Sequence, residues 1–106
     1  MSHTLSRLTL YQEPGFCGNH LVFFPSRGEH QPTDLDCWVR YTVGSVVLEL
    51  PEGRGVRVVA TDGRVTELAG ADEPQFLDQY TLMENGLYTG LTLIVWDPKS
   101  CREPSV

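Results

Sequence analysis

Apolar and polar residues alternate in several short stretches of the chain, with the two-residue period of a β-strand that packs one face on a core. Glycine and proline separate these stretches, and Pro51-Glu-Gly-Arg-Gly55 is the clearest interruption. Asp62-Gly63, between two such stretches, is typical of a two-residue hairpin turn. The pattern predicts strands over residues 8–11, 20–24, 46–50, 56–60, 64–68 and 91–96.

The segments between these strands are predicted to be irregular. Gly28 to Asp36 is polar and loop-like, and residues 80–90 lack a regular pattern. Residues 72–77 fit one helical turn, with Asp72 as its N-cap and Pro74 in its first turn. Because no long amphipathic helix is present, the sequence predicts an all-β fold, an antiparallel sandwich or barrel.

A weak internal repeat divides the chain into two similar halves. Tyr41-Thr42 precedes Gly44 in the first half, and Tyr88-Thr89 precedes Gly90 in the second. The chain has 106 residues, enough to bury the core of a single domain. We therefore expect one domain over residues 1–98, made of units at about 6–50 and 55–97 packed face to face, and a loose tail at 99–106.

The segment from Leu8 to Gly18 predicts a hairpin of unusual geometry. Tyr11 and Phe16 stand on either side of a Pro-Gly turn, and Gly18 follows them. A chain that folds back over its own sheet needs a glycine where φ is positive or where a side chain would clash. The two aromatic rings would pack together and hold the hairpin against the sheet. These three residues are therefore expected to define the fold.

This hairpin resembles the Greek-key signature of the βγ-crystallins, in which an aromatic residue, four residues, a second aromatic residue, one residue and a glycine follow one another. The strand after Gly44-Ser45 is similar to the closing strand that follows the Ser-Ser pair of that family. The resemblance covers about residues 6–97 and implies a βγ-crystallin-like sandwich of two Greek-key motifs. The second half departs from the pattern, because Asp62-Gly63 replaces the folded hairpin and no aromatic pair is present.

In that family, a loop before the closing strand of each motif often holds calcium through oxygen atoms, the ligands that this hard cation takes. The corresponding windows here are residues 40–45 and 85–90. The first holds Arg40, whose charge opposes a divalent ion, and the second lacks an acid and the last Ser. The resemblance therefore implies weak or lost calcium binding, or loops closed by backbone hydrogen bonds alone. The candidate ligands are Glu13 (or Gln12), Thr42, Ser45, Asn85 and Thr89, with the second window plus the first hairpin as the preferred place.

The net charge and the hydropathy of the chain argue against two classes of partner, nucleic acids and membranes. Lys and Arg number 8 against 14 Asp and Glu, so the formal net charge is -6, and a nucleic acid, which needs a basic surface, is not expected. No apolar run approaches the roughly 20 residues of a membrane-spanning helix, so a membrane is not expected either. Residues 1–7 lack the features of a secretory signal, so a soluble, cytoplasmic chain is expected.

Three cysteines, Cys17, Cys37 and Cys101, cannot all pair with one another. Reduced thiols are expected in the cytoplasm, with a Cys17–Cys37 bridge as the alternative. Cys17-x-x-His20 also has the residue types of zinc ligands, and a thiol with His20 or His30 has those of a nucleophile and its base. No phosphate-binding or oxyanion motif accompanies them, so an enzyme is not expected.

Phe23 and Phe24 are adjacent in a predicted strand and therefore point to opposite faces. One of them must leave the core, for a surface that binds a protein partner, for a dimer seam, or for a place covered by the loop at 28–36. The sequence thus predicts a non-enzymatic structural or binding module. The alternative is an inhibitor or interaction partner of an enzyme that uses loops 28–36 and 78–88, because the same sandwich resembles that of small microbial protease inhibitors.

Overall fold

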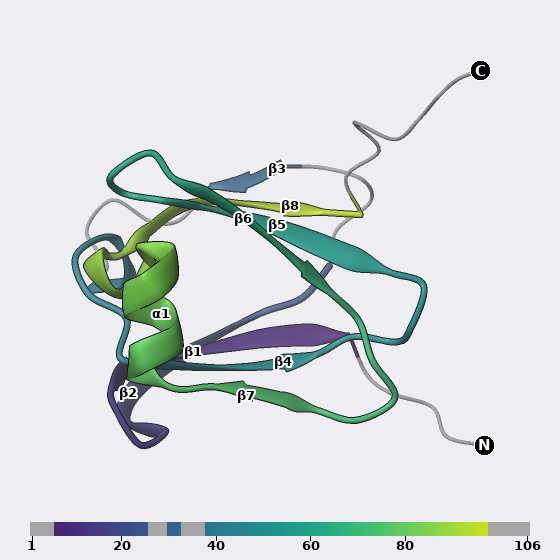
Figure 1. Ribbon diagram of the computed structural model, residues 1–106, viewed down its shortest axis with the longest axis horizontal. Helices are drawn as coiled ribbons and strands as arrows, with labels where there is room; N and C mark the ends of the chain where they lie inside the picture. Colours follow the sequence, from purple (N-terminus) through teal and green to yellow (C-terminus); the bar gives the residue numbers. More distant parts are fainter. Residues whose placement is uncertain (1–5, 26–29, 33–37, 98–106) are drawn as a thin grey trace.

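The protein is seen here in a computed structural model, which describes residues 6–25, 30–32 and 38–97. Two four-stranded antiparallel sheets face each other, and a short helix lies at one end of the sandwich (Figure 1). Sheet A has the strand order β2-β1-β4-β7, and sheet B has the order β3-β8-β5-β6. The elements are β1 (Arg7–Glu13), β2 (Cys17–Phe23), β3 (His30–Pro32), the 3-10 helix η1 (Trp38–Arg40), β4 (Ser45–Glu49), β5 (Gly55–Ala60), β6 (Val65–Ala69), β7 (Gln75–Leu77), α1 (Gln79–Asn85), the 3-10 helix η2 (Leu87–Thr89) and β8 (Leu91–Trp96). The predicted all-β sandwich is confirmed.

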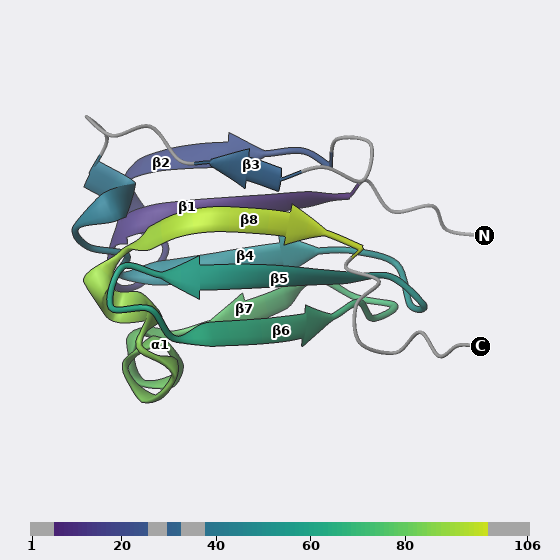
Figure 2. The ribbon, with the colours of Figure 1, turned by 90° about the horizontal axis from the view of Figure 1, so that it is seen from above.

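Each half of the chain places three strands in one sheet and one strand in the other. β1, β2 and β4 lie side by side in sheet A, whereas β3 pairs with β8 of the second half. β5, β6 and β8 lie together in sheet B, whereas β7 pairs with β4 of the first half. The two halves are therefore joined by strand pairing as well as by the core between the sheets (Figure 2).

Alternation along the strands turns one face of each sheet into the core. Every second residue of β5 is buried, and Val58 lies opposite Ile94 of β8. Because each pair of neighbouring strands aligns its apolar positions, the inner faces of the two sheets meet in one continuous cluster. The buried members of that cluster are Leu8, Leu10, Val39, Val43, Val46, Leu48, Leu50, Val56, Val58, Ala60, Leu82, Leu87, Leu91, Ile94 and Trp96.

The prediction for residues 72–77 was wrong, since they include strand β7 and no helical turn. The helix is α1, which begins after them at Gln79 and extends into the segment 80–90 that was predicted to be irregular. Its N-cap is Asp78 and not Asp72, and the Asp78 carboxylate accepts a hydrogen bond from the amide of Thr81. β7 is a strand because it pairs with β4, a contact that local sequence does not encode.

The predicted loop at 28–36 contains strand β3, so that prediction was wrong for residues 30–32. β3 forms because it pairs with β8 at the edge of sheet B. The expectation for the two adjacent phenylalanines is confirmed: Phe23 packs against the core, whereas Phe24 is 54% exposed. The predicted tail at 99–106 lies outside the described residues.

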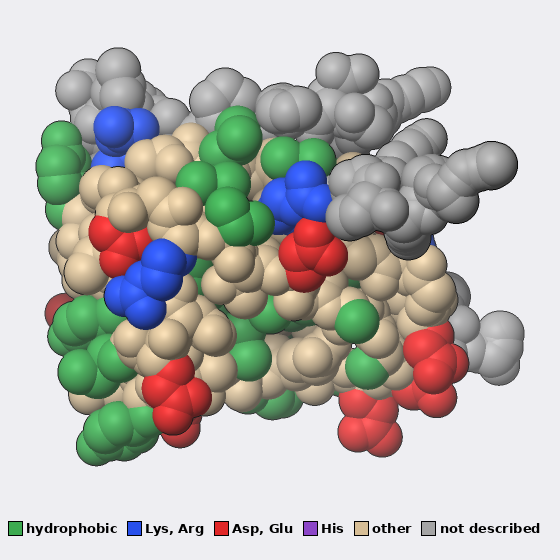
Figure 3. Space-filling view, turned by 45° about the horizontal axis from the view of Figure 1, so that its top comes forward, with side chains coloured by type: hydrophobic (Ala, Val, Ile, Leu, Met, Phe, Trp, Pro, Cys, Tyr) green, Lys and Arg blue, Asp and Glu red, His purple; other side chains and the backbone are tan. Residues whose placement is uncertain are grey.

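The outer face of sheet B carries paired charges. Arg57 of β5 lies opposite Glu67 of β6 and forms an ion pair with it, and Arg54 pairs with Asp97 at the end of β8. Figure 3 shows basic and acidic side chains next to one another on this side of the molecule. Among the residues that the structure describes, no helix has the length and apolar character needed to cross a membrane.

Candidate functional site

The first hairpin folds back over the outer face of sheet A. The rings of Tyr11 and Phe16 meet edge to face, with their centroids 6.0 Å apart, and Gly18 has a φ of 86°. The predicted ring contact and the predicted positive φ are therefore confirmed. Phe16 also contacts Phe76 of β7 at a centroid distance of 5.5 Å, so the hairpin reaches across the sheet.

Ser45, the first residue of β4, holds this hairpin in place through two hydrogen bonds. Its side chain is fully buried, and its hydroxyl donates to the carbonyl of Glu13 (2.8 Å) and accepts from the amide of Phe16 (2.9 Å). Gly44 brings the two segments close together: a Cβ at this position would lie 2.3 Å from the carbonyl carbon of Glu13. Ser45 was a predicted calcium ligand. In the structure, its hydroxyl group bonds to the backbone of the first hairpin.

The second hairpin and both predicted calcium windows meet at one end of the sandwich. Thr61 donates through its hydroxyl to the carbonyl of Arg40 and through its amide to the carbonyl of Gly90, both at 2.8 Å. The amide of Val43 donates to the carbonyl of Tyr88 at 3.2 Å. The first window is therefore bonded to the second hairpin through the Thr61 hydroxyl and to the second window through a backbone hydrogen bond.

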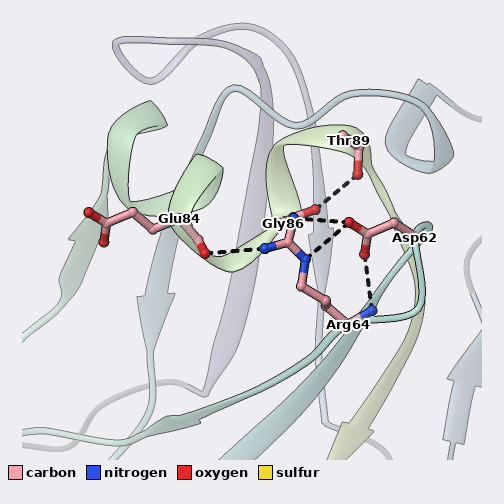
Figure 4. Close-up of polar contacts among 5 residues, drawn as sticks. All are labelled: Asp62, Arg64, Glu84, Gly86 and Thr89. Atoms are coloured by element: carbon pink, nitrogen blue, oxygen red, sulfur yellow. Dashed lines mark hydrogen bonds and ion pairs between the residues drawn. The ribbon is translucent and has the colours of Figure 1, made fainter.

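Arg64 fills the space between the second hairpin and the end of helix α1 (Figure 4). Its guanidinium donates to the carboxylate of Asp62 (3.1 Å) and to the carbonyl of Glu84 (3.4 Å). A Cβ on Gly86 would lie 2.5 Å from the Arg64 Nε, so the guanidinium rests directly on this glycine. The carbonyl of Gly86 accepts from the hydroxyl of Thr89 at 2.9 Å. A positive group thus lies between the Asp62 carboxylate and the Glu84 carbonyl.

The negative charge of the Asp62 carboxylate and the partial negative charge of the Glu84 carbonyl favour a cation at the position of the Arg64 guanidinium. The backbone amide of Arg64 donates to Asp62 at 3.0 Å and, together with its guanidinium, holds the pKa of the Asp62 carboxyl below its ordinary value of 3.8. Carbonyl groups at a helix C-terminus carry partial negative charge, and the Glu84 carbonyl is one of them. The Arg64 side chain is 57% exposed, so salt screens its ion pair.

The structure separates the predicted calcium ligands into two groups. Glu13 and Ser45 meet at the first hairpin, whereas Asn85 is the last residue of α1 and Thr89 is the last residue of η2. Among the described residues, no hydrogen bond or ion pair connects the two groups. Other contacts engage two further candidates: the amide of Thr42 donates to the carbonyl of Trp38, and the amide oxygen of Gln12 accepts from Asn19.

The predicted zinc pair is exposed and lies on β2. Cys17 is a free thiol whose Sγ donates to the carbonyl of Pro14 at 3.3 Å, and the ring of His20 packs on Tyr11 at a centroid distance of 5.6 Å. Within the described ranges, no three side chains of the His, Cys, Asp and Glu types are grouped so that they could hold a metal ion. Cys37, Cys101 and the side chain of His30 lie outside the described residues.

An open groove of about 330 Å³ lies at the other end of sheet B, beside the start of β5. Each charged side chain that lines it is in an ion pair: Arg54 with Asp97, and Glu67 with Arg57. The guanidinium of Arg54 holds the pKa of Asp97 below its ordinary value of 3.8. The groove therefore presents neutralised charges to a ligand.

Sequence reasoning missed Arg64, the residue that joins the second hairpin to α1. The Asp62-Gly-Arg64 turn is a local signal, because an Asp side chain commonly accepts from the backbone amide two residues later. The contact with Glu84 spans 20 residues and depends on where α1 begins, which the sequence placed wrongly. Helix α1 also replaces the predicted contact loop at 78–88.

No family model matches the chain, and comparisons with curated proteins and with solved structures gave no match. Inference about function therefore rests on the two hairpins and their contacts.

Proposed function

We propose that this chain is a non-enzymatic, βγ-crystallin-like domain of two Greek-key motifs, a structural or binding module in which calcium binding is weak or lost. One observation carries the functional part: the Arg64 guanidinium lies between the Asp62 carboxylate and the Glu84 carbonyl, where the second hairpin meets the end of α1 beside the second window. A divalent cation placed there would meet a positive charge at close range. Arg64 thus takes the place that a metal ion would need.

The strand order supports the architectural part of the proposal. In each half, the fourth strand lies beside the first and the third strand crosses to the opposite sheet. The folded hairpin supports it independently, because Tyr11, Phe16 and Gly18 take the ring contact and the positive φ that the hairpin pattern predicts.

The first window supports weak binding for a different reason. The carbonyl of Arg40 already accepts from Thr61, and the hydroxyl of Ser45 is bonded to the first hairpin. A calcium ion takes six to eight oxygen ligands, and these bonds already use part of the acceptor capacity of both oxygens.

Calcium titration of metal-free protein, followed by calorimetry or by equilibrium dialysis, tests the proposal. We expect no saturable binding up to about 10 mM calcium, beyond the weak end of protein calcium sites. Saturable binding within that range would contradict it. Magnesium serves as the control for non-specific attraction of divalent ions to a chain with a net charge of -6.

A further inference from the structure

In the described part of the chain, four strands lie at sheet edges: β2 and β7 in sheet A, and β3 and β6 in sheet B. An edge strand exposes backbone N–H and C=O groups that can pair with another chain. Proteins protect such edges by shortening the strand or by placing charges or proline on it.

Three of these edges carry such protection. β3 and β7 contain three residues each, and β3 ends at Pro32. β6 is longer, but its exposed face carries the charged side chain of Glu67, which is paired with Arg57. A second chain that approached β6 would have to displace or bury this ion pair, which is costly.

β2 carries none of these features. It is seven residues long, its sequence Cys-Gly-Asn-His-Leu-Val-Phe holds no Lys, Arg, Asp, Glu or Pro, and Phe24 follows it. Val22 and Phe24 are 37% and 54% exposed. β2 has a neighbouring strand on one side only among the described residues. Within the described ranges, β2 is therefore a long edge that carries no charged side chain, has exposed apolar residues at its C-terminal end and is open to pairing.

We propose that β2 is the contact strand of a homodimer, in which it pairs antiparallel with β2 of a second copy and joins the two A sheets into one. Antiparallel pairing of a strand with itself is two-fold symmetric, so the assembly closes at two copies. It satisfies the outward backbone groups and covers Val22 and Phe24 on both copies. The inference goes beyond the proposed function, because it does not depend on any metal.

Charge favours a second copy over a charged peptide as the occupant. β2 offers no ionic side chain that a basic or an acidic segment could recognise. Two copies each carry a net charge of -6 and repel each other, but no like charges oppose one another along β2 itself. The dimer should therefore become tighter as salt screens the repulsion, whereas a basic partner would bind more weakly.

Sedimentation equilibrium of the full chain over about 1 µM to 1 mM tests the proposal. Reducing agent excludes disulfide-linked dimers through the exposed Cys17. We expect a reversible monomer–dimer equilibrium that shifts toward dimer at higher salt. The variant Val22→Lys should weaken association about tenfold or more, because it places a like charge on each copy at the seam. Its matched control is Val65→Lys, which adds the same charge to the 55% exposed position on edge strand β6 and should leave association unchanged.

Hydrogen–deuterium exchange of the unmodified protein tests the same contact without a mutation. Amides of β2 should gain protection as the protein concentration rises, and amides of β6 should not. A monomer at every concentration would overturn the proposal, as would an equal loss of association in the two Val→Lys variants. Species larger than a dimer would overturn it too, because strand pairing at β2 closes at two copies. Dimerisation should be the same in chelator and in calcium, so this result and the calcium result are independent.

Discussion

The two hairpins of this sandwich occupy corresponding places in the two halves of the chain but are held by different chemistry. The first folds over its sheet and is fixed by Ser45, whose hydroxyl is fully buried and bonds to two backbone groups of the hairpin. The second is a short turn at the surface, fixed by the hydroxyl of Thr61 and by the guanidinium of Arg64. Both halves nevertheless have the same strand order.

The difference shows that the strand arrangement does not require one particular hairpin. A buried hydroxyl that satisfies two backbone groups stabilises strongly, because its removal leaves those groups without partners. An exposed ion pair contributes little and is screened by salt. We therefore expect most of the sensitivity to substitution to lie at the first hairpin.

The largest effect is expected at Gly44. The variant Gly44→Ala would place a Cβ 2.3 Å from the carbonyl carbon of Glu13, so the hairpin must move away from β4. We expect a loss of about 3 kcal/mol or more of unfolding free energy, measured by urea denaturation. Gly55→Ala is the matched control, because its Cβ would have its nearest contact at 3.5 Å. Equal losses in the two variants would contradict the close approach at Gly44.

The variants Ser45→Ala and Thr61→Val compare the hydrogen bonds that hold the two hairpins. Ser45→Ala leaves the carbonyl of Glu13 and the amide of Phe16 without their partner, and should cost about 2 kcal/mol of unfolding free energy. Thr61→Val removes one exposed hydrogen bond to Arg40 and should cost about 0.5 kcal/mol. Urea denaturation of both variants measures the two losses of unfolding free energy. A larger loss for Thr61→Val would contradict the expectation that the first hairpin is the more sensitive to substitution.

The extent to which sequence predicted this molecule follows the range of the contacts involved. Strands β5 and β8 are six residues long and consist almost entirely of apolar, largely β-branched residues between turn residues, so their existence was predicted correctly. β3 and β7 contain three residues each and owe their strand form to partners more than 25 residues away, so no local pattern could identify them. Helix α1 was missed because only Leu82 among its seven residues is buried, which is too little to show helical periodicity.

In the candidate site, too, contacts within one local segment were predicted and contacts between distant segments were not. Tyr11, Phe16 and Gly18 lie within one hairpin, and their contact was predicted from their spacing. The bond between Ser45 and that hairpin spans 29 residues and was not predicted, although Ser45 had been singled out. The contacts of Arg64 depend on the position of α1, so the sequence left this residue without a role.

The smallest effect is expected at Asp62 and depends on pH. Its pKa is lowered in the folded protein, so its interaction with Arg64 stabilises the fold above the ordinary pKa of 3.8 and is lost as the pH falls below that value. Asp62→Asn should therefore be slightly less stable than the natural chain at neutral pH and equal to it at strongly acidic pH. The deficit of Ser45→Ala should stay constant over the same range, because no titrating group is involved. Thermal unfolding at several pH values measures both, and a pH-independent deficit for Asp62→Asn would contradict the charge-based account.

Calcium-dependent thermal unfolding tests most directly whether Arg64 excludes calcium from the second hairpin, as proposed above. The midpoint of the natural chain should change by less than about 1 °C between chelator and about 10 mM calcium. Arg64→Ser, which frees the Asp62 carboxylate and the Glu84 carbonyl, should rise by about 3 °C or more, as expected for a weak calcium site. Arg7→Ser, which removes an arginine from the ion pair with Glu49 in sheet A, should show no rise. A calcium-dependent rise in the natural chain, or none in Arg64→Ser, would contradict the claim.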